Sequence, residues 1–276
     1  MAPVTRFAPS PTGHLHLGHA YSALFAWHTA RSEDGRFLLR IEDIDRQRCR
    51  PGFERDLLED LDWLGLTWER PVRRQSDHFD AYRSALDALQ ALGVTYPCFC
   101  SRRDIALAAG APHEEDGNGP LYPGRCRAVS VTEAAARIAG GQPYATRLHV
   151  ANAVAITGQL DWTDRSAGPQ TARPELLGDV VLDRRDTPSS YHLSVTVDDA
   201  IQGVTLVTRG TDLFAATHVH RLLQALLGLP TPGYHHHGLL TGADGKRLSK
   251  RDGALSIRAL RDHGHTAAEI RKMAGF

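Results

Sequence analysis

The first 41 residues contain two apolar runs typical of strands, separated by a segment whose apolar residues have helical spacing. Short apolar runs at Val4–Ala8 and Arg36–Ile41 each suit one strand. Between them, Leu17–Ala30 places apolar side chains on one face at helical spacing, and Pro9–Gly13 interrupts regular structure after the first run. Strand, helix and strand in this order predict a βαβ unit and therefore a parallel sheet.

Later segments continue both patterns. Further helices are predicted at 53–64, 78–92, 132–138 and 212–227, the last with Asp212 as its N-cap. Further strands are predicted at 144–148, 153–157 and 204–208. The strands at 144–148 and 153–157 are expected to belong to an inserted subdomain, and a second sheet-forming half is expected to begin near Val180.

The composition is that of an ordinary globular protein, with 42% hydrophobic and 23% charged residues. Lys+Arg and Asp+Glu number 32 each, so the formal net charge is zero and any contact with nucleic acid has to use a local patch. No apolar run reaches the roughly 18 residues of a membrane span, and the N-terminus does not resemble a signal peptide. We expect no membrane partner and a cytoplasmic location.

The turn after the first strand carries two imidazoles. His16-Leu17-Gly18-His19 stands at the start of the predicted helix, where unpaired backbone N–H groups and the helix dipole favour an anion. Two histidines three residues apart can contact phosphate oxygens there, and Gly18 permits close approach to the backbone. A lone string of this kind is also compatible with an ordinary polar turn.

A late loop gathers positive charge. The stretch Lys246–Arg251 holds four cations in six residues, with Gly242, Gly245 and Gly253 around it. Such a loop can stabilise the charge that builds on a triphosphate during displacement at the α-phosphorus, and its glycines permit opening and closing. By itself the stretch is equally compatible with a solvated basic loop.

Taken together and in this order, the two strings resemble the HIGH and KMSKS signatures of class I aminoacyl-tRNA synthetases. Three further stretches are similar to the glutamate-specific branch: Arg6–Gly13, Arg40–Asp45 and Arg209–Leu213. The resemblance covers nearly the whole chain. It implies an α/β fold with a Rossmann-type parallel sheet and an inserted α+β subdomain. The expected division is a nucleotide-binding domain in two halves, 1–95 and 179–276, around an insertion at 96–178.

The number of residues after Lys250 indicates which members of this family the chain resembles. Full glutamyl-tRNA synthetases continue into a helical anticodon-binding domain, whereas only 26 residues follow Lys250. The chain therefore resembles the shortened glutamyl-Q tRNA(Asp) synthetases. That family implies activation of glutamate by ATP with Mg²⁺ in the absence of tRNA, followed by transfer to a hydroxyl of queuosine in the anticodon of tRNA(Asp). Glutamate, ATP and queuosine-bearing tRNA(Asp) are the expected partners, and a monomer is expected.

The resemblance also implies a site. A substrate with two carboxylates and one ammonium needs cationic and anionic contacts, and arginine binds a carboxylate through two N–H groups. Glu42 is expected to hold the ammonium, and Lys250 the leaving pyrophosphate. The implied glutamate-binding residues are Arg6, Phe7, Ala8, Pro9, Ser10, Glu42, Tyr191 and Arg209. The implied catalytic and ATP-binding residues are His16, Gly18, His19 and Lys250.

Clustered cysteines form a third constellation. Cys98, Cys100 and Cys126 favour a metal site in a reduced compartment over a disulfide framework, and they supply three of the four ligands of tetrahedral zinc. The family pattern, Cys-x-Cys followed by Tyr-x-x-x-Cys, is present and implies Tyr122 as the fourth ligand, while His113 is a rival on chemistry alone. We expect one structural Zn²⁺ per chain, with three metal-free thiols as the alternative.

Other functions are compatible with parts of this pattern. An ordinary glutamyl-tRNA synthetase would charge the 3′ end of tRNA(Glu). A nucleotidylyltransferase of the same fold would share the His-x-x-His turn but lack Arg40–Asp45, and a non-catalytic RNA-binding module would leave the signature loops unused. His235–His237 is not expected to bind a metal, because neighbours on a strand point to opposite faces. These histidines are either structural or include one that approaches the adenine.

Overall fold

The computed structural model describes residues 2–101, 103–105, 121–184, 186–240 and 256–276. The basic loop with Lys250 lies outside these ranges, and so does His113. Within them, no helix has both the length and the apolar character that crossing a bilayer requires.

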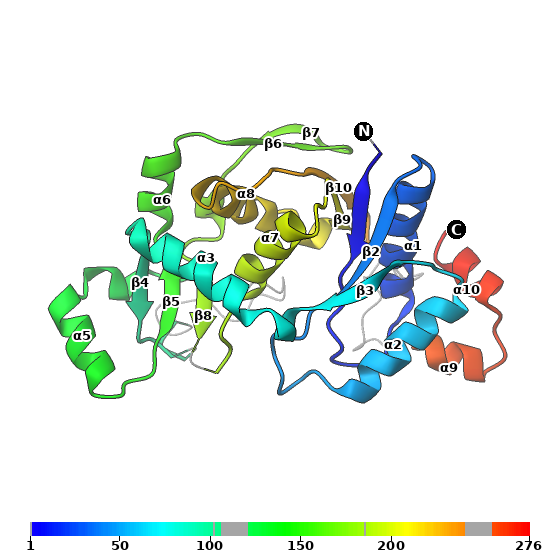
Figure 1. Ribbon diagram of the computed structural model, residues 1–276, viewed down its shortest axis with the longest axis horizontal. Helices are drawn as coiled ribbons and strands as arrows, with labels where there is room; N and C mark the ends of the chain where they lie inside the picture. Colours follow the sequence, from blue (N-terminus) through cyan, green and yellow to red (C-terminus); the bar gives the residue numbers. More distant parts are fainter. Residues whose placement is uncertain (1, 102, 106–120, 185, 241–255) are drawn as a thin grey trace.

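Helices and strands alternate along most of the chain (Figure 1). The strands are β1 Val4–Phe7, β2 Arg36–Ile41, β3 Glu69–Arg74, β4 Thr95–Cys98, β5 Ala145–Leu148, β6 Asp161–Asp164, β7 Gly168–Thr171, β8 Val181–Arg184, β9 Leu206–Gly210 and β10 Gly233–His237. The helices are α1 Leu17–Arg31, α2 Pro51–Trp63, α3 Phe79–Ala91, α5 Val131–Ala139, α6 Val150–Thr157, α7 Tyr191–Ile201, α8 Ala216–Leu226, α9 Ile257–Asp262 and α10 Ala267–Met273. Short 3-10 helices are η1 Gln75–Asp77, η2 Arg125–Ala128, η3 Pro174–Leu176 and η4 Thr211–Leu213.

Two largely parallel sheets lie edge to edge and form the framework. In the first, β2 lies between β1 and β3, and all three strands are parallel. In the second, β10 lies parallel between β9 and β6, and β7 pairs antiparallel with β6. The N–H of Thr205 donates to the carbonyl of Val4 at 3.0 Å, which makes β9 and β1 neighbours. The order β3-β2-β1-β9-β10 is that of a Rossmann fold and confirms the predicted α/β class.

The strand register brings four carboxyl ends to one edge of the framework. Phe7 at the end of β1 pairs with Leu39 of β2, and His237 at the end of β10 pairs with Gly210 at the end of β9. In open α/β sheets this edge is where ligands bind.

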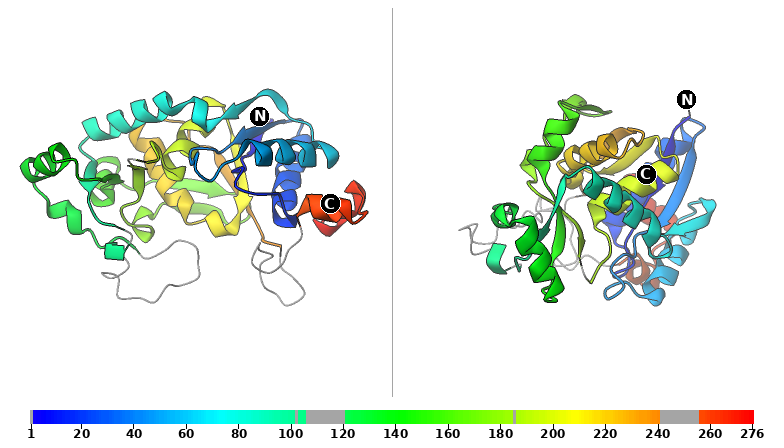
Figure 2. Two further views of the ribbon diagram at one scale, coloured as in Figure 1. Left: turned by 90° about the horizontal axis from the view of Figure 1, so that it is seen from below. Right: turned by 60° about the vertical axis from the view of Figure 1, so that its left-hand side comes forward.

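A third, antiparallel sheet forms the insertion, with β5 between β4 and β8. Helix α5 lies at one end of the molecule, and α9 and α10 lie at the opposite end (Figures 1 and 2). The first and last strands of this sheet, β4 and β8, lie at or beyond the expected boundaries at 95/96 and 178/179. The division of the chain into three parts stays a prediction.

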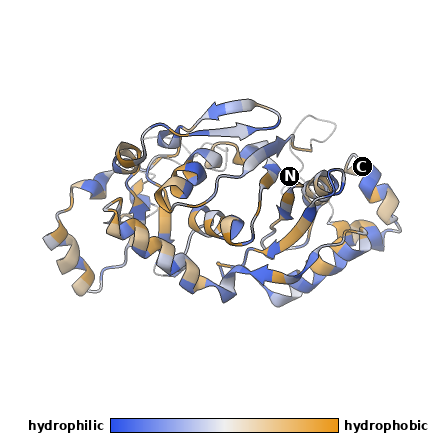
Figure 3. Cartoon of the chain, turned by 45° about the horizontal axis from the view of Figure 1, so that its top comes forward, coloured by the Kyte–Doolittle hydropathy of each residue, from blue (hydrophilic) through white to orange (hydrophobic). Residues whose placement is uncertain are grey.

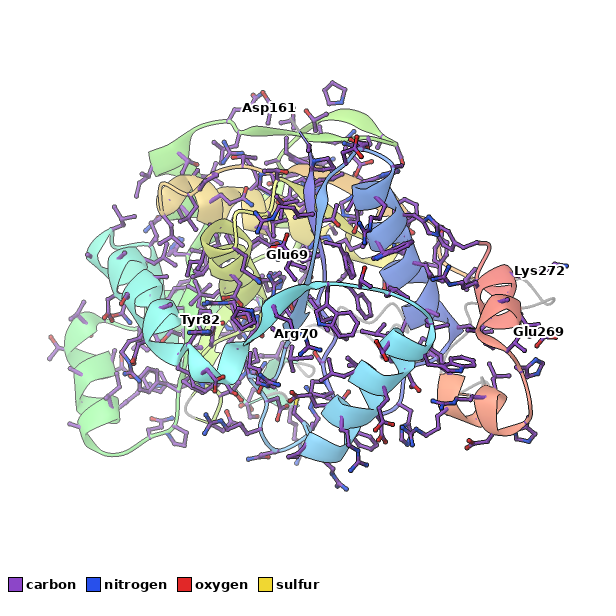
Figure 4. The ribbon with its side chains drawn as sticks, turned by 45° about the vertical axis from the view of Figure 1, so that its right-hand side comes forward. Glu69, Arg70, Tyr82, Asp161, Glu269 and Lys272 are labelled. Atoms are coloured by element: carbon purple, nitrogen blue, oxygen red, sulfur yellow. The ribbon has the colours of Figure 1, made fainter. Side chains whose placement is uncertain are left out.

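Helix α1 packs against β1 and β2 through a face of small side chains, which lets it lie close to the sheet. The buried residues of this face are Ala20, Ala23, Leu24, Ala26 and Ala30. Helices throughout the molecule carry hydrophobic and hydrophilic bands (Figure 3), as expected of elements that bury one face. The outer side of α10 is polar, and its exposed Glu269 and Lys272 point away from the body of the molecule (Figure 4).

Two predictions from the sequence pattern are wrong, one strand and one helix cap. The pattern predicts a strand at 153–157, but these residues belong to α6, because a short apolar run does not distinguish the two structures. The imidazole of His149 caps that helix by accepting from the N–H of Asn152 at 3.3 Å. Asp212 does not cap α8, which begins at Ala216, since Thr211–Leu213 forms η4 instead.

A buried carboxylate on α7 connects the two halves of the framework. The side chain of Asp198 has no solvent exposure. It accepts hydrogen bonds from Tyr82 Oη at 2.8 Å, Gln75 Nε2 at 2.8 Å and Arg73 Nε at 2.7 Å. Tyr82 belongs to α3 (Figure 4), and the other two donors belong to η1 and β3. A single side chain thereby satisfies donors from three elements more than 100 residues earlier.

Removing this carboxylate is expected to destabilise the fold strongly. In Asp198→Ala the Arg73 guanidinium and two neutral donors lose their buried acceptor, so the free energy of unfolding should fall by about 3–5 kcal/mol. Urea denaturation measures the change. Asp87→Ala, at an exposed position of α3, is the matched control and should change the free energy of unfolding by less than about 0.5 kcal/mol. Equal effects of the two substitutions would contradict this role of Asp198.

Candidate active site

A cavity of about 230 Å³ opens where the four strand ends meet the beginning of α1. Its walls come from the ends of β1, β2, β9 and β10 and from the first turns of α1 and α7. The residues that line it are Arg6, Phe7, Ala8, His16, Gly18, His19, Tyr21, Ser22, Glu42, Tyr191, Thr208, Arg209, Gly210, Asp212, Leu213, His237, Leu239 and Leu240. Most of the site predicted from the sequence therefore meets in one place.

The two imidazoles of the first motif cap α1. His16 is the N-cap, and its Nδ1 accepts from the N–H of Gly18 at 3.1 Å, while Nδ1 of His19 accepts from the N–H of His16 at 3.2 Å. Because both Nδ1 atoms accept, the neutral rings carry their protons on Nε2, which makes Nε2 a donor. A Cβ at position 18 would stand 3.1 Å from the His16 ring, so glycine keeps this cap intact.

Arg6, which lines the cavity, and Arg40, which lies behind it, share the carboxylate of Asp199. Arg6 Nε donates to Asp199 at 3.0 Å, and Arg40 Nη1 donates to the same carboxylate at 2.7 Å. Arg40 Nη2 also donates to Glu42 at 3.1 Å. Burial opposes ionisation of Asp199, but Arg6 and Arg40 outweigh it and hold the pKa of Asp199 below its usual value. Burial raises the pKa of Glu42 against the pull of both arginines, and a bound ammonium would lower it again.

The guanidinium of Arg209 is held differently, by neutral groups. Nε donates to His236 Nε2 at 3.1 Å, and Nη1 lies 3.2 Å from Tyr191 Oη and 3.1 Å from His220 Nδ1. Nη2 donates to the hydroxyl of Thr217. Among the described residues, no carboxylate forms an ion pair with Arg209, although the residue is 5% exposed. The cavity therefore presents a buried cation to which no anion of the described protein is paired.

The histidines around Arg209 are kept neutral. Burial and then Arg209 lower the pKa of His236 to about 4, in spite of the carboxylate of Asp164, whose Oδ2 lies 2.7 Å from His236 Nδ1. Burial and Arg209 also lower the pKa of His192 to about 4 and hold the pKa of His220 well below its usual value. Asp164 fixes the proton of His236 on Nδ1, so Nε2 is left as the acceptor that Arg209 needs.

The chain returns to the first motif after residues 241–255. Leu240, before this stretch, lines the cavity, and Ser256, after it, forms a β-bridge with His16. The N–H of Ile257 donates to the carbonyl of Leu15 at 2.8 Å, and Arg258 contacts Glu59 of α2 at 2.6 Å. The described residues on both sides of the KMSKS-like stretch thus lie at the cavity, while the predicted position of Lys250 itself lies outside the described residues.

The predicted cysteine cluster also comes together, in the insertion. The Sγ atoms of Cys98, Cys100 and Cys126 lie within 4.8 Å of one another. Cys100 and Cys126 are 3.6 Å apart, close to the roughly 3.8 Å expected between thiolates about 2.3 Å from one zinc ion. Tyr122 Oη lies 3.9 Å from Cys100 Sγ and accepts from the N–H of Cys126 at 2.7 Å. The donor set fits a tetrahedral site for a soft divalent metal.

Some residues predicted for the site do not line the cavity, and several residues in or behind the cavity wall are not predicted from the sequence. Pro9 and Ser10 do not line the cavity, although the carbonyl of Pro9 holds the backbone N–H of Glu42 at 3.0 Å. Asp199 accepts from Arg6, and Asp164 holds the His236 imidazole that accepts from Arg209. These contacts depend on pairings between distant elements, which no local motif indicates. Alternation along β10 does indicate that His236 faces away from its two neighbours.

Comparison with known proteins agrees with this geometry. The sequence profile described as "tRNA synthetases class I (E and Q), catalytic domain" matches residues 3–274, and the chain belongs to this family. It is 52% identical, over 99% of its own length and 100% of the relative's, to a Glutamyl-Q tRNA(Asp) synthetase of Rhodobacter capsulatus. It is 45% identical, over 94% of its length and 81% of the relative's, to a protein of the same name from Symbiobacterium thermophilum.

Among solved structures, the fold is similar to the crystal structure of glutamate-tRNA synthetase from Elizabethkingia anophelis. The TM-score is 0.77 at 28% sequence identity, and the match covers 92% of this chain. It covers 53% of that chain, so the protein spans about half the length of this solved relative.

One buried carboxylate of α2, near Arg258 and His14, lacks hydrogen-bond partners among the described residues. Asp60 of α2 is fully buried, and neither of its oxygens has a partner among the described residues. Burial raises the pKa of Asp60 to about 6, in spite of the nearby charges of Arg258 and His14. At neutral pH the folded protein therefore holds an ionised carboxylate that the unfolded chain would solvate better.

Asp60→Asn is expected to stabilise the protein in a pH-dependent way. The pKa of Asp60 is higher in the folded than in the unfolded state, so its ionisation opposes folding. This destabilisation is absent well below pH 4, grows between about pH 4 and pH 6, and is complete above about pH 6. The substitution should raise the free energy of unfolding at pH 7.5 by an amount on the order of 2 kcal/mol, and the gain should shrink toward pH 4. Urea denaturation at several pH values tests this. Exposed Asp62→Asn on the same helix is the control, and a gain independent of pH would refute the interpretation.

Proposed function

We propose that the protein activates glutamate with ATP and transfers the glutamyl group to queuosine in the anticodon of tRNA(Asp). The observation that carries this proposal is the buried Arg209 guanidinium, held only by neutral groups among the described residues, in a cavity capped by His16 and His19. The family and the names of the two relatives described above support the same reaction.

The glutamate site is proposed at the floor of the cavity. Arg209 and Arg6 would bind carboxylate, since contacts with the described residues use four of the five N–H groups of Arg209 and three of those of Arg6. Glu42 would hold the ammonium, next to Arg40, which orients it. Tyr191, Phe7 and Ala8 would complete the walls. Glutamine would replace one carboxylate by an amide and lose the ionic contact, so the site favours glutamate.

The triphosphate of ATP is proposed to lie at the beginning of α1. His16 and His19 would donate from Nε2 to phosphate oxygens, and Gly18 leaves the backbone accessible. A carboxylate oxygen of glutamate attacks the α-phosphorus, the bond to the β-phosphate oxygen breaks, and pyrophosphate leaves. The protein positions the reactants and stabilises the charge, so no side chain has to act as nucleophile. Mg²⁺ with ATP, and the contact of Lys250 with pyrophosphate, stay predictions.

In the second step, a hydroxyl of the queuosine cyclopentenediol attacks the carbonyl carbon of the adenylate, and AMP leaves. The names of relatives that match over 81–100% of their own length favour this acceptor over the 3′ end of tRNA(Glu). ATP and tRNA as substrates are consistent with the predicted cytoplasmic location. A monomeric state stays a prediction.

The purified protein is expected to catalyse ATP–pyrophosphate exchange that requires glutamate and does not require tRNA. Radiolabelled glutamate should then become attached to queuosine-bearing tRNA(Asp), but not to the same tRNA with guanosine at that position. Charging of tRNA(Glu) instead would establish the ordinary glutamyl-tRNA synthetase. Exchange without any dependence on glutamate would favour a nucleotidylyltransferase, and absence of exchange would favour a non-catalytic module.

We further propose that Cys98, Cys100, Cys126 and Tyr122 bind one structural Zn²⁺. The cluster joins the end of β4 to η2, and Asp179 reinforces the same junction by accepting from Arg127 of η2 and Tyr96 of β4. Burial opposes ionisation of Cys126, but hydrogen bonds from Tyr122 and the N–H of Phe99 lower the pKa of its thiol, which favours the thiolate that a metal binds.

Metal analysis by mass spectrometry should find one zinc ion per chain in the wild-type protein. Cys126→Ser removes one of three thiolates and should leave far less than one zinc per chain after dialysis. Cys49→Ser, the free cysteine outside the cluster, should keep the full amount. Wild-type protein without zinc, or full retention in Cys126→Ser, would show that these thiols are not a zinc site.

A further inference from the structure

The last residue of β10, His237, adds a third imidazole to the cavity, whose hydrogen bonds differ from those of His16 and His19. His237 lines the cavity and is 4% exposed. Its ring packs edge-on against Tyr21 of α1 at 4.7 Å between centroids and lies 4.9 Å from the ring of Phe25. His236, its neighbour, faces the other way toward Arg209. His237 is therefore separated from the groups proposed to bind glutamate.

The hydrogen bond of His237 Nδ1 determines the chemistry of its other ring nitrogen, Nε2. Nδ1 lies 2.8 Å from the carbonyl oxygen of Gly238, which can only accept, so Nδ1 carries a proton. Burial lowers the pKa of His237, so the ring is neutral and Nε2 is an acceptor. Nε2 is buried and has no partner among the described residues. Buried polar atoms are rarely left unsatisfied, so this acceptor indicates a donor on the ligand.

The chemistry of the substrates limits the choice of donor. Glutamate offers only its ammonium group, for which Glu42 is the proposed anionic partner. The triphosphate offers no donor when ionised. What remains on ATP is the amino group of adenine and the ribose hydroxyls. The aromatic rings of Tyr21 and Phe25 beside His237 suit a flat base better than a sugar.

We propose that His237 Nε2 accepts a hydrogen bond from the 6-amino group of adenine and thereby selects ATP. The proposal rests on the function proposed above and identifies the side chain that distinguishes adenine from other bases. GTP and ITP carry a carbonyl oxygen at this position, which would face the lone pair of Nε2 and leave two acceptors opposed. His237 is thus a residue that determines nucleotide specificity, on the side of the cavity away from the arginines.

Calorimetric binding of ATP and of purine-riboside triphosphate, which lacks only the 6-amino group, tests the contact directly. Wild-type protein should bind ATP about fivefold more tightly than the analogue, the range expected of one neutral hydrogen bond. His237→Met, of similar size but without the acceptor, should bind both equally. His237→Gln, whose amide oxygen can accept, should restore part of the preference. His235→Met, on the same face of β10 but outside the cavity lining, should behave as wild type.

Several outcomes would overturn the proposal. It is wrong if wild-type protein does not distinguish the two nucleotides, or if His237→Met keeps the wild-type preference. It is also wrong if 2′-deoxy-ATP or 3′-deoxy-ATP, and not the purine analogue, loses affinity in a manner that depends on His237, because the ribose would then be the partner. The glutamate-dependent exchange assay is independent of this measurement. A preference that depends on His237 without any exchange would support the nucleotide contact and refute the proposed reaction.

Discussion

The burial of arginine at the carboxyl ends of the strands is the constraint on which the rest of the structure depends. A buried guanidinium is stable only when its N–H groups and its charge are compensated. Arg6 and Arg40 obtain this from Asp199, with Glu42 as a further partner of Arg40. Within the described part of the chain, Arg209 contacts only dipoles, those of neutral imidazoles, a phenol and a hydroxyl. Because its charge is not balanced by a described carboxylate, Arg209 favours the binding of an anion in the cavity.

The same constraint explains how distant elements are arranged. Asp198 and Asp199 stand side by side on α7, and they connect that helix with β3 and α3 on one side and with β1 and β2 on the other. Asp164 of β6 reaches Arg209 through His236, across the parallel pairing of β6 and β10. Two glycines that line the cavity, Gly18 and Gly210, have no room for a side chain. A Cβ at position 210 would stand 2.4 Å from Asp212.

Local sequence predicts the framework and the motif residues because their determinants are local. The turn with His16 and His19 and the strand that ends before Glu42 are each set by spacing within a few residues. The cysteine cluster is predicted from its Cys-x-Cys and Tyr-x-x-x-Cys pattern, although Cys100 and Cys126 are 26 residues apart. Residues 153–157 are mispredicted because an alanine- and valine-rich run suits either period. The network around Arg209 could not be predicted, since Asp164 and His236 lie 72 residues apart and meet only through the sheet. The orientation of His237 likewise depends on how β10 faces α1.

Whether Arg209 is the cation that selects the anionic substrate can be tested most directly by calorimetry with glutamate and glutamine. Wild-type protein should bind glutamate at least about tenfold more tightly than glutamine, since a charge-assisted hydrogen bond is lost with the amide. Arg209→Gln should abolish that difference, whereas Arg173→Gln, at an exposed site, should preserve it. If Arg209→Gln retained the wild-type preference for glutamate, this role of the buried guanidinium would be contradicted.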